Sequence, residues 1–297
     1  AIDWSPEATT IGGFTSVAVF GSDGAFYALV NRCPHGRGPL SEGIVHGSSV
    51  TCPLHNWVID LASGNATGPD EGEEALFEGI DLEGITTDGT HFYVVGSQSK
   101  PQGGDLTGLA RFKFDSQNQR ILDTQSIAGL KSFLANNVDE LRGMQQTTYE
   151  KGGINVEGLA WDPNRKRLLL GLRSPVVEGQ ALIIPLKLRD PQGAFSFDNV
   201  EVEGRKAIRL PLNGAGIRSI EYDEPGKTFR LITGAGPNSE KMDFKLWDWS
   251  GNGEPPTLRE TDTFDRRLKP EGITRVKSGD QSFTFIVFDT SGYAAKN

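Results

Sequence analysis

The chain has few of the features that mark disulfide scaffolds, membrane spans or nucleic-acid-binding surfaces. Its 297 residues include only two cysteines, and no apolar run approaches the roughly 20 residues that a membrane-spanning helix needs. Its 30 basic residues are outnumbered by 39 acidic ones, which gives a net charge of −9, whereas a nucleic-acid backbone requires basic surface. The motifs G-x-S-x-G, G-x4-G-K-[ST] and H-E-x-x-H are absent. We therefore expect no nucleic-acid partner, no membrane span and none of the common hydrolase or nucleotide-binding signatures.

Both cysteines stand beside histidines in a repeated arrangement. Cys33-Pro-His35 is followed, after sixteen residues, by Cys52-Pro-Leu-His55. Two thiolates on one iron and two imidazoles on the other are the ligands of a Rieske 2Fe–2S cluster. Thiolates suit iron bridged by sulfide, and the neutral imidazoles make one iron easier to reduce. The pattern predicts that Cys33, His35, Cys52 and His55 bind such a cluster and that the chain transfers electrons.

Two other accounts of these residues fit less well. A Cys2His2 zinc site takes its cysteines from one half of the motif and its histidines from the other, but here each half supplies one of each. A disulfide between Cys33 and Cys52 would leave both neighbouring histidines unexplained.

The stretch from Ala25 to Gly72 resembles the Rieske domain of the small subunit of assimilatory nitrite reductase. The likeness covers about residues 14–74 and includes the runs GPLS at 38–41, GIVHG at 43–47 and NW at 56–57. It implies that the four motif residues bind the cluster and that Trp57 covers the cluster edge. The chain lacks the extra cysteine pair of respiratory Rieske domains, which favours a low-potential, ferredoxin-like cluster. The resemblance also points to the cytoplasm, although an exported protein stays compatible with the rest of the sequence.

The rest of the chain is repetitive. Five segments, beginning at residues 13, 79, 153, 214 and 268, each read as a short apolar strand, a turn rich in Gly, Asp, Asn or Pro, and a second alternating strand. With 37 Gly and 16 Pro, this spacing predicts an all-β chain that forms a β-propeller of about five or six blades. Apolar residues at spacings of three and four predict one inserted helix near 124–141.

Residues 75–297 also resemble bacterial propeller proteins related to the phytase-like and esterase-like propellers. The segments that carry this likeness are IDLEG at 80–84, GINVEGL at 153–159 and LGLRSP at 170–175. We expect a Rieske-like module at 1–74 joined to a propeller at 75–297. Residues 13–30 fit the first propeller blade equally well, with 33–72 as an insert in it.

Aligning the repeats predicts a ring of side chains around the propeller channel, because innermost strands face the axis. The equivalent positions are Thr15, Glu83, Glu157, Arg218 and Glu271. Carboxylates that converge in this way repel unless a cation offsets them, and Arg218, Arg173 or a divalent metal such as Ca2+ would serve. The ring is interpreted either as a small-molecule or metal site, or as a structural carboxylate–arginine network, and we favour the structural network.

These observations favour an electron-transfer protein, or a redox subunit of an oxidoreductase such as a nitrite reductase-like system. The propeller would then dock a redox protein partner or a larger oxidoreductase subunit, for which an acidic surface suits a basic partner. One alternative is a propeller hydrolase of esterase or phosphoesterase type that uses Glu83, Glu157 and Glu271. The other is a non-catalytic scaffold.

Overall fold

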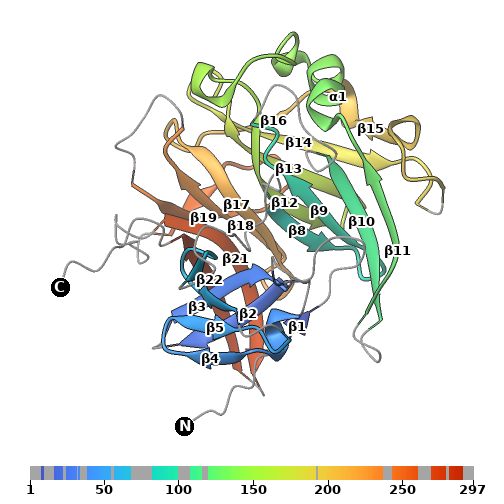
Figure 1. The fold of residues 1–297 in the computed structure, drawn as a ribbon. Helices are drawn as coiled ribbons and strands as arrows, with labels where there is room; N and C mark the ends of the chain where they lie inside the picture. The colour runs from blue at the N-terminus through green and yellow to red at the C-terminus, as the bar shows by residue number, and fades with distance from the viewer. Residues whose placement is uncertain are drawn as a thin grey trace. The chain divides into compact units, whose positions relative to one another are not determined.

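The computed structural model confirms an all-β chain with few helices (Figure 1). It describes residues 8–9, 17–22, 25–31, 33, 39–54, 57–67, 82–99, 108–115, 120–191, 193–236, 243–259, 269–278 and 281–289. By internal packing the chain divides into two units, one comprising Ala1–Ile80 and Phe112–Thr124 and the other comprising Asp81–Arg111 and Gln125–Asn297. Among the described residues, no helix is long and apolar enough to cross a membrane.

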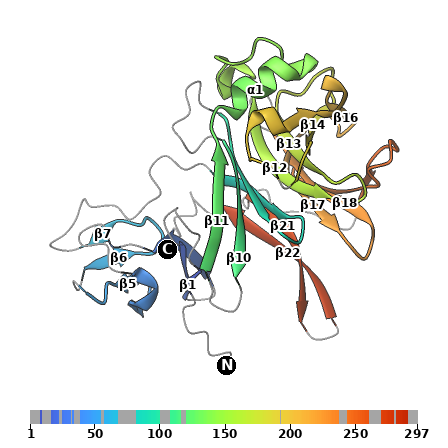
Figure 2. The ribbon, with the colours of Figure 1, turned by 90° about the vertical axis from the view of Figure 1, so that its right-hand side faces the viewer.

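The first unit contains two small antiparallel sheets, with strands in the orders β1-β2-β3 and β4-β5-β6-β7. Figure 2 shows β5, β6 and β7 side by side. The strands are β1 (Ala8–Thr9), β2 (Val17–Ser22), β3 (Ala25–Val30), β4 (Ile44–His46), β5 (Ser49–Thr51), β6 (Val58–Asp60) and β7 (Ala66–Thr67), with a 3-10 turn η1 at Leu40–Glu42. The β4–β5 hairpin turns through two residues, and the first of them, Gly47, has φ of 55°. Such tight hairpins need this left-handed backbone, which glycine adopts at little cost.

Four further antiparallel sheets have the strand orders β8-β9-β10-β11, β12-β13-β14-β15, β17-β18-β19-β20 and β21-β22. They belong to the second unit, except that β10 from Phe112 onward and β11 up to Thr124 are assigned to the first unit. The strand β16 pairs with β14. The bounds are β8 (Leu82–Thr87), β9 (Phe92–Gly96), β10 (Leu109–Asp115), β11 (Arg120–Ile127), β12 (Asn155–Asp162), β13 (Arg167–Ser174), β14 (Ala181–Leu188), β15 (Val200–Val202), β16 (Ile208–Leu210), β17 (Gly216–Asp223), β18 (Thr228–Gly234), β19 (Lys245–Trp249), β20 (Thr257–Leu258), β21 (Lys269–Ser278) and β22 (Gln281–Asp289). The 3-10 turns are η3 (Asp139–Leu141), η4 (Tyr149–Lys151), η5 (Phe197–Asn199) and η6 (Glu203–Arg205).

All five predicted repeats form antiparallel hairpins. They are β2–β3, β8–β9, β12–β13, β17–β18 and β21–β22. In the second unit the first strands of the hairpins are neighbours in the order β8, β12, β17, β21. Each sheet therefore starts from an inner strand and continues outward, as the blades of a propeller do.

The prediction of one helix over 124–141 was wrong in its length. Residues up to Ile127 belong to β11, the helix α1 covers only Leu130–Asn137, and a 3-10 turn follows. Gly129, at the helix N-cap, has φ of 81°. This left-handed conformation turns the chain between the strand and the helix. The helix buries Leu130 and Leu134, so the three-and-four spacing located the buried face but not the ends.

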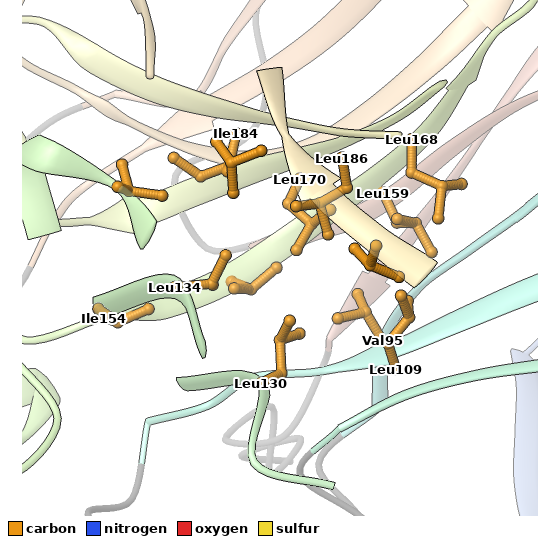
Figure 3. Close-up of a cluster of buried hydrophobic side chains, with 14 of the residues drawn as sticks. Val95, Leu109, Leu130, Leu134, Ile154, Leu159, Leu168, Leu170, Ile184 and Leu186 are labelled. Atoms are coloured by element: carbon orange, nitrogen blue, oxygen red, sulfur yellow. The ribbon is translucent and has the colours of Figure 1, made fainter. Parts of the chain in front are cut away.

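The largest core of the second unit joins α1 to the β8–β11 and β12–β15 sheets. Leu130 and Leu134 of the helix belong to one hydrophobic cluster with Ile154, Leu170 and Ile184, and Figure 3 draws these side chains. The strands β12, β13 and β14 are buried along most of their length, as expected for strands covered on both faces. This buried core includes β12, one of the inner strands that carry the second site described below.

Candidate functional site

The first candidate site lies on the loops that carry the two cysteines. Cys33 and Cys52 are both fully buried. Both lie among the described residues, and they are not joined by a disulfide. They belong to one hydrophobic cluster with Phe20, Leu40 and Val50. Two buried thiols brought into one apolar cluster fit the thiolate half of an iron–sulfur site, in which burial excludes water.

Hydrogen bonds hold the two cysteine loops. The backbone N–H of Cys52 donates to the carbonyl oxygen of Trp57 at 2.7 Å, which closes the loop that contains the C-x-x-H motif. On the other loop, the N–H of Ser41 donates to Oδ1 of Asn31 at 2.7 Å. Gly43 lies against β5, where an added Cβ would meet the Thr51 carbonyl oxygen at 2.5 Å. Glycine is therefore required for β4 to approach the strand that leads into Cys52.

The histidine half of the predicted site lies outside the described residues, because neither His35 nor His55 is among them. Trp57 is half-buried and packs against the same hydrophobic cluster as the cysteines. The hairpin β2–β3 contributes Ala18, Phe20 and Leu29 to this cluster. The first repeat therefore packs with the cysteine loops.

The second candidate site is formed by the residues that the sequence predicts to ring a propeller channel. Oxygen atoms of Glu83, Glu157 and Glu271 lie within 4.8 Å of one another. Each of these three glutamates, and likewise Arg218, lies at a shift in the register of its hairpin. The shifts fall between Leu82 and Gly84, Val156 and Gly158, Ile217 and Ser219, and Pro270 and Gly272. Glu83, Glu157, Arg218 and Glu271 are therefore the extra residues of four β-bulges. A bulge re-aims its side chain away from the regular alternation, which explains how four sheets present their residues to one place.

Two arginines engage the carboxylates. Arg173 Nη1 donates to Glu157 Oε1 at 2.8 Å, and Arg218 Nη1 lies 3.5 Å from Glu157 Oε2. Arg218 also binds Glu271. Burial by itself would lower the pKa of Arg218, but the carboxylates of Glu157 and Glu271 outweigh it and raise the pKa. Three carboxyl groups thus face two guanidinium groups, and burial raises the pKa of Glu157 even though Arg218 and Arg173 oppose the shift.

The glycine that follows three of these residues has a packing role. A Cβ on Gly84 would lie 2.7 Å from Cβ of Leu159, and one on Gly158 would lie 2.9 Å from Cγ2 of Ile220. Gly84 and Gly158 thus let one inner strand approach the next, whereas a Cβ on Gly272 would lie 2.8 Å from Cγ2 of Val287 in its own hairpin. Thr15, the fifth predicted member of the ring, lies outside the described residues.

Sequence reasoning missed a hollow further along the same inner strands. A groove of about 550 Å³ is lined by residues such as Ile85, Trp161, Glu221 and Phe285. The sequence shows only that these strands contain apolar residues. A period-two pattern does not say which face of the sheet those residues lie on unless the register of the hairpin is known.

A family model described as "Protein of unknown function (DUF3616)" matches residues 114–294. The chain belongs to the DUF3616 family. The DUF3616 region is preceded by a match of residues 4–77 to the Rieske [2Fe-2S] domain, so the predicted N-terminal Rieske domain is confirmed.

The Rieske part of this DUF3616 protein is similar to ferredoxin components of dioxygenase systems. It is 32% identical over 68 residues to the ferredoxin component of the naphthalene 1,2-dioxygenase/salicylate 5-hydroxylase systems of Ralstonia sp, covering 22% of this chain and 65% of that protein. It is 39% identical over 57 residues to the anthranilate 1,2-dioxygenase ferredoxin subunit of Burkholderia cepacia, covering 19% and 53%. Among solved structures, the Sphingomonas yanoikuyae B1 ferredoxin is 30% identical, covering 24% of this chain and 71% of that one, with a TM-score of 0.22. The chain spans between half and two thirds of the length of these two curated relatives.

Proposed function

We propose that this chain is an electron-transfer protein whose N-terminal module, about residues 1–74, carries a Rieske 2Fe–2S cluster. The observation that carries the proposal is the burial of Cys33 and Cys52 in one hydrophobic cluster, within the region that matches the Rieske domain. The cysteines would hold one iron, and His35 and His55 the other. When bound, such a cluster takes up and releases one electron at a time. Trp57, packed against the same cluster of side chains, would help to exclude water from it.

The chain division proposed here joins the Rieske module directly to a propeller at residues 75–297. The packing of Phe20 and Leu29 with the cysteines supports placing the β2–β3 hairpin in the Rieske module. Within residues 75–297, the described residues form four sheets, and a propeller of five or six blades stays part of the proposal.

Iron analysis and EPR spectroscopy of the dithionite-reduced protein, purified without oxygen, test the cluster. Wild-type protein should contain about two irons per chain and give the EPR signal of a reduced Rieske cluster. Cys52→Ser should lose the iron, and His55→Asn should lose the Rieske-type spectrum. The matched control is His46→Asn, because His46 is exposed at the end of β4 and outside the motif. An iron-free wild-type preparation after anaerobic reconstitution would refute the proposal.

The partner in this proposal is an oxidoreductase component that exchanges single electrons with the cluster, docked by the propeller. The relatives named as ferredoxin components of dioxygenase systems support an oxygenase component, and the resemblance to a nitrite reductase subunit supports a nitrite reductase-like, cytoplasmic system. The net charge of −9 favours a basic partner surface.

Cytochrome c, as a generic basic acceptor, should be reduced at a rate that falls as ionic strength rises. A rate independent of salt would contradict electrostatic docking.

A second candidate function rests on the convergence of Glu83, Glu157 and Glu271. In this function the three carboxylates would bind a divalent cation such as Ca2+ and serve an esterase- or phosphoesterase-type hydrolysis. The guanidinium groups of Arg173 and Arg218 already bind these carboxylates and favour the structural network, with the propeller as a non-catalytic scaffold. Glu157→Gln distinguishes the two: loss of Ca2+ binding and of ester or phosphoester turnover, with an unchanged EPR spectrum, supports the hydrolase.

A further inference from the structure

The inner strands carry a second, chemically different feature beyond the bulge residues. The groove of about 550 Å³ draws on the later residues of β8, β12 and β17 and on the hairpin β21–β22, whereas Glu83, Glu157 and Arg218 come from the earlier residues of β8, β12 and β17. The groove lies within the second unit. Its lining is mostly apolar and includes no arginine, whereas the bulge residues form a cluster of carboxylates and arginines.

Most of the groove wall is apolar and partly open to solvent. Ile85 on β8 is 52% exposed, and Phe285 and Val287 on β22 are 49% and 47% exposed. Trp161 and Tyr222 add aromatic rings from β12 and β17. Large apolar side chains gathered in a concave wall with few polar groups are typical of small-ligand sites.

The charge of the groove has one sign. Its lining includes the carboxylates of Glu221 and Glu224 and, as far as the described residues form it, no Lys, Arg or His. Glu221 accepts a hydrogen bond from Oγ1 of Thr274 at 3.3 Å. Among the described residues no basic side chain forms an ion pair with it.

Nearby guanidinium groups are already engaged elsewhere. Arg230, opposite Glu221 on β18, lies 3.1 Å from Asp223, and Arg275 on β21 lies 2.9 Å from Asp223. Burial, and to a lesser extent Asp223, raise the pKa of Glu221 to about 7, against the opposing hydrogen bond from Thr274. The carboxyl of Glu221 is thus held in a mostly apolar wall, and no cationic side chain in the described part of the chain pairs with it.

We propose that this groove binds a small organic ammonium compound with an aromatic or aliphatic body, whose cationic nitrogen meets Glu221. The apolar body would cover Ile85, Phe285 and Val287 and so remove their surface from water. The ammonium group would gain a charge-assisted hydrogen bond to the carboxylate and attraction to the faces of Trp161 or Tyr222. An anionic ligand would instead face two carboxylates, which is why the charge decides the class of ligand.

The test uses the full chain and two probes of the same shape, 2-phenylethylammonium and the neutral 2-phenylethanol, with binding measured by titration calorimetry at pH 8. The ammonium should bind at least about tenfold more tightly than the alcohol, the difference expected for one charge-assisted contact. Its affinity should also fall about tenfold between pH 8 and pH 6, because a carboxyl with a pKa near 7 is mostly protonated at pH 6 and the cation prefers the ionised form.

Three variants separate the ligand site from other effects. Glu221→Gln keeps the shape and should lower ammonium affinity about tenfold and remove its pH dependence, while binding of the alcohol stays unchanged. Phe285→Ser should weaken both probes. Glu254→Gln, an exposed carboxylate outside the groove, should change neither.

Several results would overturn the proposal. They are equal affinity for the two probes, an equal loss in Glu221→Gln and Glu254→Gln, and no ammonium binding by a wild-type protein with native circular dichroism. A concentration-dependent dimer that Phe285→Ser dissociates would assign the surface to a second copy of the chain instead. None of these outcomes depends on the iron content that tests the proposed function.

Discussion

Asp162 is the residue whose replacement gives the clearest expected loss of stability. It lies at the end of β12, where its carboxylate accepts hydrogen bonds from the N–H groups of Asn164 and Arg165 at 3.1 and 3.2 Å and from Nε of Arg167 at 3.0 Å. The side chains of Asp162 and Arg167 are only 1% and 7% exposed. Asp162→Asn keeps an acceptor for the turn but leaves the buried guanidinium of Arg167 with Glu203 alone.

Removing one partner of a buried ion pair costs about 3–5 kcal/mol. Because Glu203 remains, the lower end applies, and we expect Asp162→Asn to reduce the free energy of unfolding by about 3 kcal/mol. For a domain of this size, the melting temperature should then fall by about 6–12 °C. Urea unfolding and thermal melts followed by circular dichroism measure both.

The matched control is Glu178→Gln, which breaks an ion pair with Arg209 while Glu178 is 80% exposed. Surface pairs contribute less than about 1 kcal/mol, so this variant should melt with the wild type. If Asp162→Asn loses no more stability than Glu178→Gln, the buried pair does not stabilise the second unit and the reasoning fails.

Three further changes test the packing and the groove. Leu134→Ala removes a fully buried side chain from α1 and should cost about 2–5 kcal/mol in urea unfolding; a cost below 1 kcal/mol would mean that the helix is not part of the core. Gly158→Ala places a Cβ 2.9 Å from Ile220 and should cost about 1–3 kcal/mol, which an unchanged urea midpoint would contradict. Because the pKa of Glu221 is raised from 4.5 to about 7, its folded form binds a proton that the unfolded chain releases, so its contribution to stability declines between pH 4.5 and 7. Glu221→Gln should therefore be more stable relative to wild type at pH 8 than at pH 5, as measured by melting temperature, and a constant difference would refute the shifted pKa.

The local parts of this fold could be predicted from the sequence because they depend on neighbouring residues. Alternation and turn residues located all five hairpins, and the pairing of Cys33 with His35 and of Cys52 with His55 indicated the Rieske domain. The spacing of Leu130, Leu134 and their neighbours predicted a helix. It did not predict where that helix begins, because the apolar residue Ile127 fits the spacing but belongs to a strand.

Other features depend on register and on contacts between sheets, which one sequence does not contain. Aligning the repeats placed Glu83, Glu157 and Glu271 at equivalent positions, but the bulges that turn them to one place follow from hairpin pairing. Likewise, nothing near Glu221 in the sequence marks it as a half-buried carboxyl, because its hydrogen-bond partner Thr274 and the groove residue Phe285 belong to a distant hairpin.

The bulges have a consequence for how the electrostatics of this protein can vary. A residue that stands outside the ladder has no partner strand position to satisfy, so exchanging it leaves the pairing on both sides intact. Arg218 occupies the position that glutamate holds in the other three sheets, which illustrates such an exchange. Replacing Arg218 would therefore change the charge of the carboxylate–arginine cluster and its ion pairs with Glu157 and Glu271, while the strand pairing on either side of the bulge is kept.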